Sequence, residues 1–177
     1  MNFIRINSKD NKYFDNAMKV YQSSFPIFEQ RTMNNQIEVL EDDRYYCTVI
    51  CDNDVFIGLL FYWKFENYIY IEHLAISQEL RGQNYGSKIL TAFCKENPNT
   101  ILEIDPPVDE VSIKRLHFYS KLGFKLQPFT HVHPPYRKGN HGHDLKILSF
   151  NRDLEQEEYD KFNTFLKDVV MMYSENV

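Results

Sequence analysis

The sequence lacks the basic runs that proteins use to bind nucleic acid or anionic membranes. No uninterrupted run of Lys and Arg is longer than two residues, and the formal net charge is −5. Binding to a phosphate backbone or to an anionic lipid surface depends on clustered positive charge. We therefore expect no nucleic-acid partner and no membrane partner, and the acidic balance favours a basic or amine-bearing small substrate.

Long apolar runs and paired cysteines are also missing. No segment approaches the roughly 18 apolar residues of a membrane span, and residues 1–5 do not begin a charged region followed by an apolar stretch. The three cysteines, Cys47, Cys51 and Cys94, have neither C-x-x-C nor zinc-type spacing and lie in apolar surroundings. These absences predict a cytoplasmic protein whose cysteines are buried and reduced.

The remaining composition is that of a globular protein. Of the 177 residues 43% are hydrophobic, and 14 Phe and 12 Tyr supply many aromatic rings. A chain of this length usually folds as one domain. We expect residues 1–177 to form a single domain.

The hydrophobic periodicity predicts a mixed α/β fold. Helical spacing of apolar residues marks segments 14–25, 33–40, 86–96 and 159–173, and a further helix is expected to start near Asp109 or Ser112 and to end at Gly123. Strand-like runs occupy 2–7, 45–51, 55–65, 68–76, 100–104, 125–126 and 145–151. The polar breaks at 52–54 and 66–67 predict two tight hairpins. The segment 128–144, rich in Pro, His and Gly, is expected to be a loop.

Glycine is scarce, yet two of the six glycines lie between a strand and a helix, in residues 81–86. A loop that enters a helix N-terminus presents unpaired N–H groups and the positive end of the helix dipole, which suits a pyrophosphate. Arg81 can add a charge-assisted contact and Ser87 a hydroxyl donor. The segment 81–87 therefore predicts a site for a phosphate-bearing ligand.

Three sequence motifs resemble those of the GNAT superfamily of acetyl-CoA-dependent N-acetyltransferases, and they occur in the order and spacing of that family. Residues 81–86 are similar to its signature R/Q-x-x-G-x-G/A, although Asn84 stands where glycine is usual. Asn is the non-glycine residue most tolerant of positive φ, so the loop geometry can survive. Residues 70–76 resemble the fourth strand of the family, and residues 118–124 resemble its FYxKLGF motif. The resemblance implies a central twisted, mostly antiparallel sheet flanked by helices.

The resemblance also implies two catalytic residues. Glu72 stands where many family members place a general base, and a carboxylate in an apolar strand is costly to bury without purpose. Tyr119 matches the tyrosine that acts as general acid toward the CoA sulfur. A structural, hydrogen-bonded Glu72 and a merely packed Tyr119 stay open as alternatives. His73 is expected to face away from Glu72, as neighbours on a regular strand do.

Acetyl-CoA is the implied co-substrate. The backbone N–H groups of Leu74 and Ile76 are implied to hold the pantetheine arm and to polarise the thioester carbonyl, beside a bulge in the strand. Ser112 occupies the place of a family Asn that contacts the same arm. The implied CoA-binding set is Leu74, Ala75, Ile76, Arg81, Gly82, Gln83, Asn84, Tyr85, Gly86, Ser87 and Ser112.

The residues on the acceptor side are less specific. Glu103 and Asp105 are two apart on one strand and so share a face. They can bind a cationic amine or replace Glu72 as the base, or they are solvated acids before Pro106. Residues 131–143 hold four of the six histidines as two H-x-H pairs. Such pairs can bind zinc, but no carboxylate or Cys clearly completes a tetrahedral set and we expect no metal.

The histidine-rich stretch is better interpreted as a loop that covers the substrate. Within it, Tyr136 and Arg137 can recognise an aromatic or carboxylate-bearing acceptor. An ordinary exposed loop is the alternative.

The sequence as a whole predicts an N-acetyltransferase that uses a primary amine of a small molecule or, less readily, of a peptide. A non-catalytic acyl-CoA-binding module is the alternative, suggested by Asn84 and Ser112, and a metal-dependent regulator built on the H-x-H pairs is a third. The terminal helix fits a monomer or a homodimer, and no motif selects the acceptor.

Overall fold

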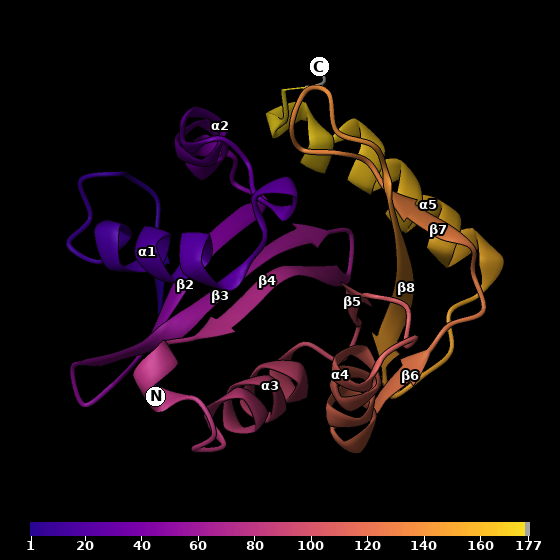
Figure 1. Cartoon of the computed structure of the whole chain (residues 1–177), viewed down its shortest axis with the longest axis horizontal. Helices are drawn as coiled ribbons and strands as arrows, with labels where there is room; N and C mark the ends of the chain where they lie inside the picture. The colour runs from indigo at the N-terminus through magenta and orange to yellow at the C-terminus, as the bar shows by residue number, and fades with distance from the viewer. Residues whose placement is uncertain (176–177) are drawn as a thin grey trace.

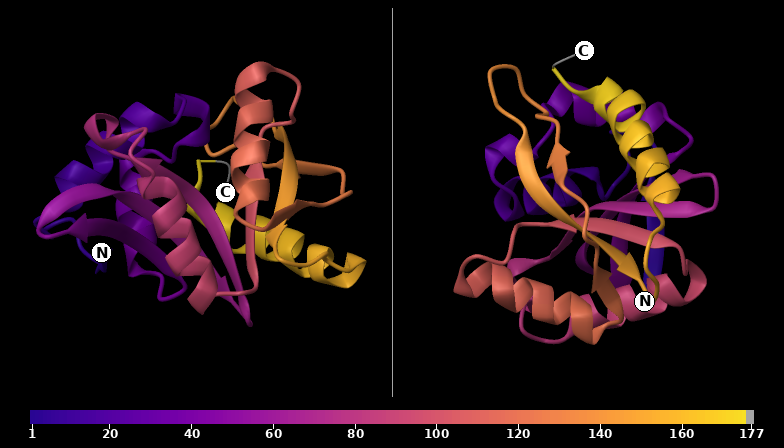
Figure 2. Two further views of the ribbon diagram at one scale, coloured as in Figure 1. Left: turned by 90° about the horizontal axis from the view of Figure 1, so that it is seen from below. Right: turned by 90° about the vertical axis from the view of Figure 1, so that its right-hand side faces the viewer.

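A mixed β-sheet lies between two layers of helices in the computed structural model, which describes residues 1–175 (Figure 1, Figure 2). Over these residues the eight strands are β1 Asn2–Ile6, β2 Tyr45–Asp52, β3 Val55–Phe65, β4 Tyr68–Ile76, β5 Thr100–Ile104, β6 Phe124–Leu126, β7 His131–His133 and β8 His143–Phe150. Their order is β1-β2-β3-β4-β5-β8-β6, with β7 paired to β8. Every pairing is antiparallel except that of β4 with β5.

The helices divide the core into two apolar layers. The α-helices are α1 Phe14–Ser24, α2 Met33–Glu38, α3 Tyr85–Glu96, α4 Glu110–Lys121 and α5 Gln156–Asp168, and the short 3-10 helices are η1 Ile27–Glu29, η2 Val39–Glu41, η3 Gln78–Leu80 and η4 Val170–Tyr173. Side chains of α1, η2 and α5 pack on one face of the sheet and those of α3 and α4 on the other. Figure 1 shows these two layers above and below the strands.

Most of the expected elements are confirmed. Asn53 and Glu66 have positive φ values of 47° and 48° in the two hairpin turns, and Asp109 caps α4 through the backbone N–H of Ser112. Gly123, with φ of 98°, follows α4 as predicted. The expectation of an unbroken loop over 128–144 is wrong, because residues 131–133 form β7 and pair with β8.

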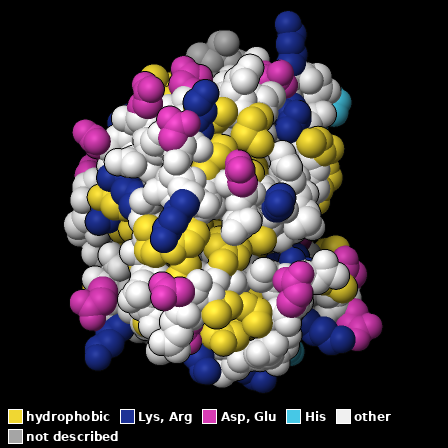
Figure 3. Space-filling view, turned by 90° about the vertical axis from the view of Figure 1, so that its left-hand side faces the viewer, with side chains coloured by type: hydrophobic (Ala, Val, Ile, Leu, Met, Phe, Trp, Pro, Cys, Tyr) yellow, Lys and Arg dark blue, Asp and Glu magenta, His cyan; other side chains and the backbone are white. Residues whose placement is uncertain are grey.

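Among the residues that the structure describes, the face shown in Figure 3 carries no basic patch. On the face over α1 and the β1 edge, acidic and basic side chains are interspersed among apolar groups and do not gather by sign (Figure 3). All three cysteines are buried and free. In the described part of the chain, no helix combines the length and apolarity needed to cross a bilayer.

A bulge in β4 changes which side chains share a face. Phe61 of β3 pairs with His73, but the next residue, Tyr62, pairs with Ile71. Glu72 is therefore the extra residue of the bulge, and Glu72 and His73 both face the α1 layer. His73 packs its ring against Tyr21 at a centroid distance of 4.9 Å. The expectation that His73 faces away from Glu72 is therefore wrong, because it assumed a regular strand.

Strands β4 and β5 diverge after a short parallel contact. Over the described residues they pair only from Ile69 with Thr100 to Ile71 with Leu102. Beyond these pairs, β4 runs on to Ile76 and β5 to Ile104 without pairing to each other. The edges of β4 and β5 that face each other are therefore without a strand partner in this region.

Candidate active site

A cavity of about 510 Å³ opens where β4 and β5 diverge. Its walls include residues 70–76 of β4 and its end, residues 102–105 of β5 and its end, Arg115 and Tyr119 of α4, and residues from η1 and from the segment between β7 and β8. Because β4 and β5 form its two sides, the cavity reaches both the α3–α4 layer and the α1 layer. Two ligands can therefore approach each other in this cavity from opposite faces of the sheet.

The glycine-containing loop leads into α3 at the edge of this cavity. Asn84 adopts the left-handed conformation with φ of 64°, as its tolerance of positive φ suggested, and Gly82 has φ of 78°. In residues 1–175, no side chain caps the first N–H groups of α3, whereas side chains form capping boxes at α4 and α5. The N-terminus of α3 thus keeps backbone donors and a positive dipole end for an anion.

Arg81 connects this loop to the strand and to α1. Its Nε donates to the Ile76 carbonyl at 3.1 Å, and its guanidinium also donates to the Ser24 hydroxyl at 2.9 Å. Gln83 donates to the Glu79 carbonyl at 3.1 Å, so its amide supports the loop from within. Arg81 also lines the cavity, so its positive charge lies at the cavity wall.

The end of β4 directs two backbone donors toward β5. Ser77 N–H donates to the Ile57 carbonyl at 2.9 Å. Hydrogen-bonded pairs recur at every second residue of an antiparallel ladder, so the N–H groups of Ala75 and His73 face β3. Those of Leu74 and Ile76 then point to the opposite edge, into the space where β5 has diverged. Two such donors can polarise a carbonyl oxygen placed between the strands.

Tyr119 reaches the cavity from the α4 side. Burial raises the pKa of its hydroxyl to about 12, while the nearby Arg115 acts in the opposite direction. Its ring is held edge-on by Phe118 and Phe124 at centroid distances of 5.2 and 5.5 Å. A phenol with this pKa stays protonated at neutral pH and can donate a proton to a leaving group in the cavity.

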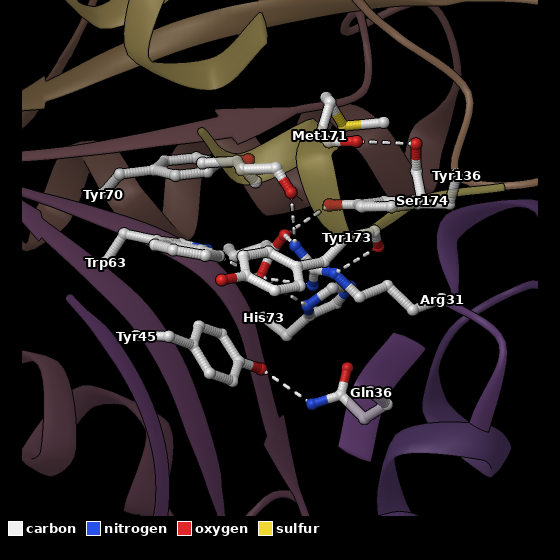
Figure 4. A network of polar contacts seen from close by, with 12 residues as sticks. Arg31, Gln36, Tyr45, Trp63, Tyr70, His73, Tyr136, Met171, Tyr173 and Ser174 are labelled. Atoms are coloured by element: carbon white, nitrogen blue, oxygen red, sulfur yellow. Dashed lines mark hydrogen bonds and ion pairs between the residues drawn. The ribbon is translucent and has the colours of Figure 1, made fainter. Parts of the chain in front are cut away.

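Glu72 is buried in an ion pair with Arg31. The guanidinium donates to both carboxylate oxygens, at 2.7 and 2.9 Å, and the two side chains are 0% and 1% exposed. The Tyr136 hydroxyl donates to Oε1 at 2.6 Å and the Trp63 indole donates to Oε2 at 3.1 Å. Figure 4 shows Arg31 enclosed by Trp63, Tyr136 and Tyr173. Each carboxylate oxygen therefore has two donors.

These contacts make Glu72 a poor proton acceptor. Burial alone would raise the pKa of Glu72, but the charge of Arg31, followed by His73 and the hydrogen bonds, lowers it to about 2. A general base works best when its pKa lies near the operating pH. The geometry therefore favours the structural alternative for Glu72 over a role as the base.

Glu103 lies on β5 and Asp105 directly follows its end, and the two side chains have different partners. Glu103 is buried and accepts hydrogen bonds from the Tyr70 hydroxyl and from Nε2 of His131. Burial opposes its ionisation, yet His133, His131 and Tyr70 lower the pKa of Glu103. Asp105 is paired with Arg115 and lies 3.4 Å from Nε2 of His143.

Negative charge gathers where η1 meets the end of β5. One carboxylate oxygen of Glu29, one of Asp105 and a ring nitrogen of His143 all lie within 4.8 Å of one another. Burial and the charge of Asp105 raise the pKa of Glu29. A cation at this position would relieve the repulsion between the two carboxylates, so the rim is suited to an ammonium group.

Three other predicted site residues use their polar groups in contacts within the protein. The Ser112 hydroxyl belongs to the capping box of α4, 2.9 Å from the Asp109 carboxylate, and Ser112 is 4% exposed. Arg137 donates to the backbone carbonyls of Gln30 and Arg31 at 3.0 and 3.1 Å. Tyr136 lines the cavity but donates to Glu72.

Sequence reasoning did not identify Arg31 and His133 as site residues. Arg31 lies outside every motif, and nothing in its neighbours shows that it is buried. In the sequence, His133 is distinguished only as half of an H-x-H pair. In the structure the two pairs separate, because His131 and His133 approach Glu103 whereas His143 approaches Asp105.

Comparison with known proteins agrees with this architecture. Residues 13–124 match the model of the acetyltransferase (GNAT) family. A structure from Bacteroides thetaiotaomicron, described as an acetyltransferase of the GNAT family, superposes with a TM-score of 0.90 at 27% identity, over 97% of this chain and 98% of that chain. YjbC of Bacillus subtilis, also named as an acetyltransferase, is 30% identical over 103 residues, which are 56% of this chain. The chain spans about half, 53%, of the length of that relative.

More distant structures share the fold. A spermidine N-acetyltransferase from Vibrio cholerae has a TM-score of 0.59 at 14% identity, over 85% of this chain and 94% of that chain. An aminoglycoside 6′-N-acetyltransferase complexed with coenzyme A has a TM-score of 0.55 at 14% identity, over 84% of this chain and 95% of that chain.

Proposed function

Because this chain belongs to the GNAT family of acetyltransferases, we propose that it transfers the acetyl group of acetyl-CoA to a primary amine of a small molecule. The observation that carries this proposal is the cavity between β4 and β5. It joins Arg81 of the loop before α3, the free N–H groups of β4 and Tyr119 on one side to an acidic rim on the other. Donor and acceptor would therefore meet between the diverging strands.

The donor would lie on the side of α3 and α4. The N–H groups that open α3, with Arg81 beside them, would hold the pyrophosphate. The pantetheine arm would then follow β4, which leaves the N–H groups of Leu74 and Ile76 to receive the thioester oxygen. A structural relative was obtained in complex with coenzyme A, which supports this use of the fold.

The reaction can be written with every proton assigned. The substrate ammonium first gives one proton to a base and through it to solvent. The neutral amine attacks the thioester carbon, a C–N bond forms, and the carbonyl electron pair moves to oxygen, where the β4 N–H groups stabilise it. The C–S bond breaks as that pair returns, and Tyr119 protonates the departing thiolate. The second amine proton then restores the Tyr119 hydroxyl.

The acceptor would enter from the α1 side. Glu29 and Asp105 supply negative charge at the rim, and Phe25 and Phe28 add aromatic surface to the cavity wall. A cationic amine fits both features, since ammonium groups are attracted to carboxylates and to aromatic faces. Two relatives in fold are named for spermidine and for aminoglycosides, which are amines of this kind.

A thiol-release assay tests the proposal. Purified protein is incubated with acetyl-CoA and spermidine, kanamycin or lysine amide, and free CoA is measured. We expect release that depends on at least one amine. Tight binding of CoA with no amine-dependent release would instead indicate a non-catalytic acyl-CoA-binding module.

Replacing Asn84 with valine is expected to weaken CoA binding. The left-handed conformation costs a residue with a Cβ about 1–2 kcal/mol, and valine is less suited to it than Asn. If this cost falls on the bound loop, the Kd for CoA rises about 5- to 30-fold. Calorimetry with CoA measures the change. Asn84→Gly is the matched control and should bind like the parent; equal affinity of the valine variant would contradict the role given to this loop.

A further inference from the structure

We propose that His133 accepts the proton that the acceptor amine must lose before it attacks the thioester. This inference rests on the proposed function and adds the base that the reaction requires. His133 lies outside residues 13–124, the segment that matches the family model. The base would thus lie on β7, outside the segment that matches the family model.

The other groups on the inner cavity wall are poor bases. Glu72 has two donors on each oxygen and a pKa of about 2. His73 is a weak base because burial, with a smaller contribution from Arg31, lowers its pKa to about 4, although Glu72 acts in the opposite direction. Glu103 accepts from Tyr70 and His131 and its pKa is lowered. These three residues can bind or orient but are ill suited to take a proton near neutral pH.

The hydrogen bonds of His133 set its tautomer. Nδ1 lies 2.6 Å from the carbonyl oxygen of Pro134, which can only accept, so Nδ1 carries the proton. Nε2 is then the basic nitrogen. The Tyr136 hydroxyl lies 3.2 Å from Nε2, but its single proton is directed to Glu72 at 2.6 Å. Among the described residues, no other donor to Nε2 is present, so its lone pair is available.

Two oxygen atoms lie near Nε2 of His133. A proton on Nε2 would face the Tyr136 oxygen and, at 3.9 Å, the Oε2 atom of Glu103. The other ionisable groups around it are His131 on β7, His73 and Glu72 on β4, and Arg31, whose charge is balanced by Glu72. Glu103 is therefore the carboxylate that compensates an imidazolium at this position.

The position of His133 is also appropriate. Its side chain is 7% exposed and lines the cavity between β4 and β5. Pairing of His133 with His143 across β7 and β8 holds its backbone in the sheet. Glu103 of β5 lies near the imidazole of His133. Tyr136, whose hydroxyl is hydrogen-bonded to Glu72 of β4, lies near it as well. Glu29 on η1 and Asp105, which is paired with Arg115, are the other carboxylates that line the cavity, and both lie at its rim.

A pH series of the His133→Gln variant distinguishes a base from a structural residue. The substrate is whichever of spermidine, kanamycin or lysine amide the parent turns over fastest. At neutral pH we expect kcat/KM to fall about a hundredfold, the lower range for loss of a general base. The difference in kcat/KM between the variant and the parent should become smaller as the pH approaches about 10, because the amine then loses its proton to the solvent. The affinity for CoA should stay at the parent value.

Two further variants complete the test. In His133→Ala, added imidazole should restore part of the rate, which a packing role would not allow. His117→Gln, on the exposed face of α4, is the matched control and should behave like the parent. A His133→Gln deficit that is constant with pH, together with no rescue by imidazole, would overturn the proposal. Parent-like activity of the variant would also overturn it, and would direct attention to Glu29.

The failures of the two proposals are distinguishable. A parent protein that binds CoA but acetylates no amine contradicts the proposed function and, with it, the role of His133. A parent that acetylates an amine while His133→Gln keeps the parent pH profile contradicts only the assignment of the base.

Discussion

Replacing Tyr119 with phenylalanine is expected to lower kcat by about a hundredfold or more. The substitution removes one hydroxyl and leaves the ring, which Phe118 and Phe124 hold in place. Without the phenol, the CoA thiolate must leave unprotonated or take its proton from water. Because the role proposed for the hydroxyl is limited to the step in which the C–S bond breaks, the Kd for CoA and the KM for the amine should change little. Steady-state kinetics with calorimetry of CoA binding measures both quantities.

Tyr46→Phe provides the matched control for Tyr119. Tyr46 lies on β2, stacks on Tyr62 at a centroid distance of 4.7 Å and is not part of the cavity wall. Its loss of a hydroxyl should leave kcat unchanged. If Tyr119→Phe keeps the parent kcat under conditions where bond breaking limits the rate, Tyr119 is a packing residue and another acid must be sought.

Replacing Glu72 with glutamine is expected to lower the free energy of unfolding by about 3–5 kcal/mol, the usual cost of removing one partner of a buried ion pair. The variant leaves Arg31 charged and fully buried. Arg31 also donates to the carbonyls of Tyr173 and Val170, at 3.1 and 3.3 Å, and so joins η4 to β4. Urea denaturation compares the variant with the parent.

The pH dependence of this loss has a definite sign. The pKa of Glu72 is about 2 in the folded protein against an ordinary value of 4.5. Its contribution to stability is therefore complete above about pH 4.5 and disappears as the pH falls toward 2. The difference in the free energy of unfolding between the parent and Glu72→Gln should become smaller over that pH interval. A difference that does not change with pH would contradict the ion-pair explanation.

Glu157→Gln is the control for Glu72. Glu157 pairs with Lys161 across one turn of α5, and its side chain is 81% exposed. Exposed pairs of this kind contribute little, because water screens the charges and the side chains lose freedom. This variant should unfold like the parent.

The strands and helices could be predicted from the sequence where the information is local. The hairpin breaks at 52–54 and 66–67, the helix after Asn84 and the cap at Asp109 all depend on residues close to one another in the chain. Strand β7 could not be predicted, since its three residues have no apolar alternation and are stabilised by pairing with β8.

The candidate site also combines residues that local motifs identify with residues that only long-range contacts bring together. The loop before α3 and the position of Tyr119 belong to local motifs, and the sequence placed both. The partner of Glu72 could not be inferred, because Arg31 is 41 residues away and reaches it only when the bulge turns the carboxylate toward the α1 layer. The approach of His133 to Glu103 likewise requires the pairing of β5 and β7 with β8.

Transfer of an isotopically labelled acetyl group tests the central claim most directly. The parent protein is mixed with labelled acetyl-CoA and the amine that it accepts, and the amine is analysed by mass spectrometry. We predict that the label appears as an amide on the primary amine, in an amount equal to the CoA released, and that Tyr119→Phe slows both together. Release of CoA without label on the amine, or no release with any amine despite binding of CoA, would contradict it.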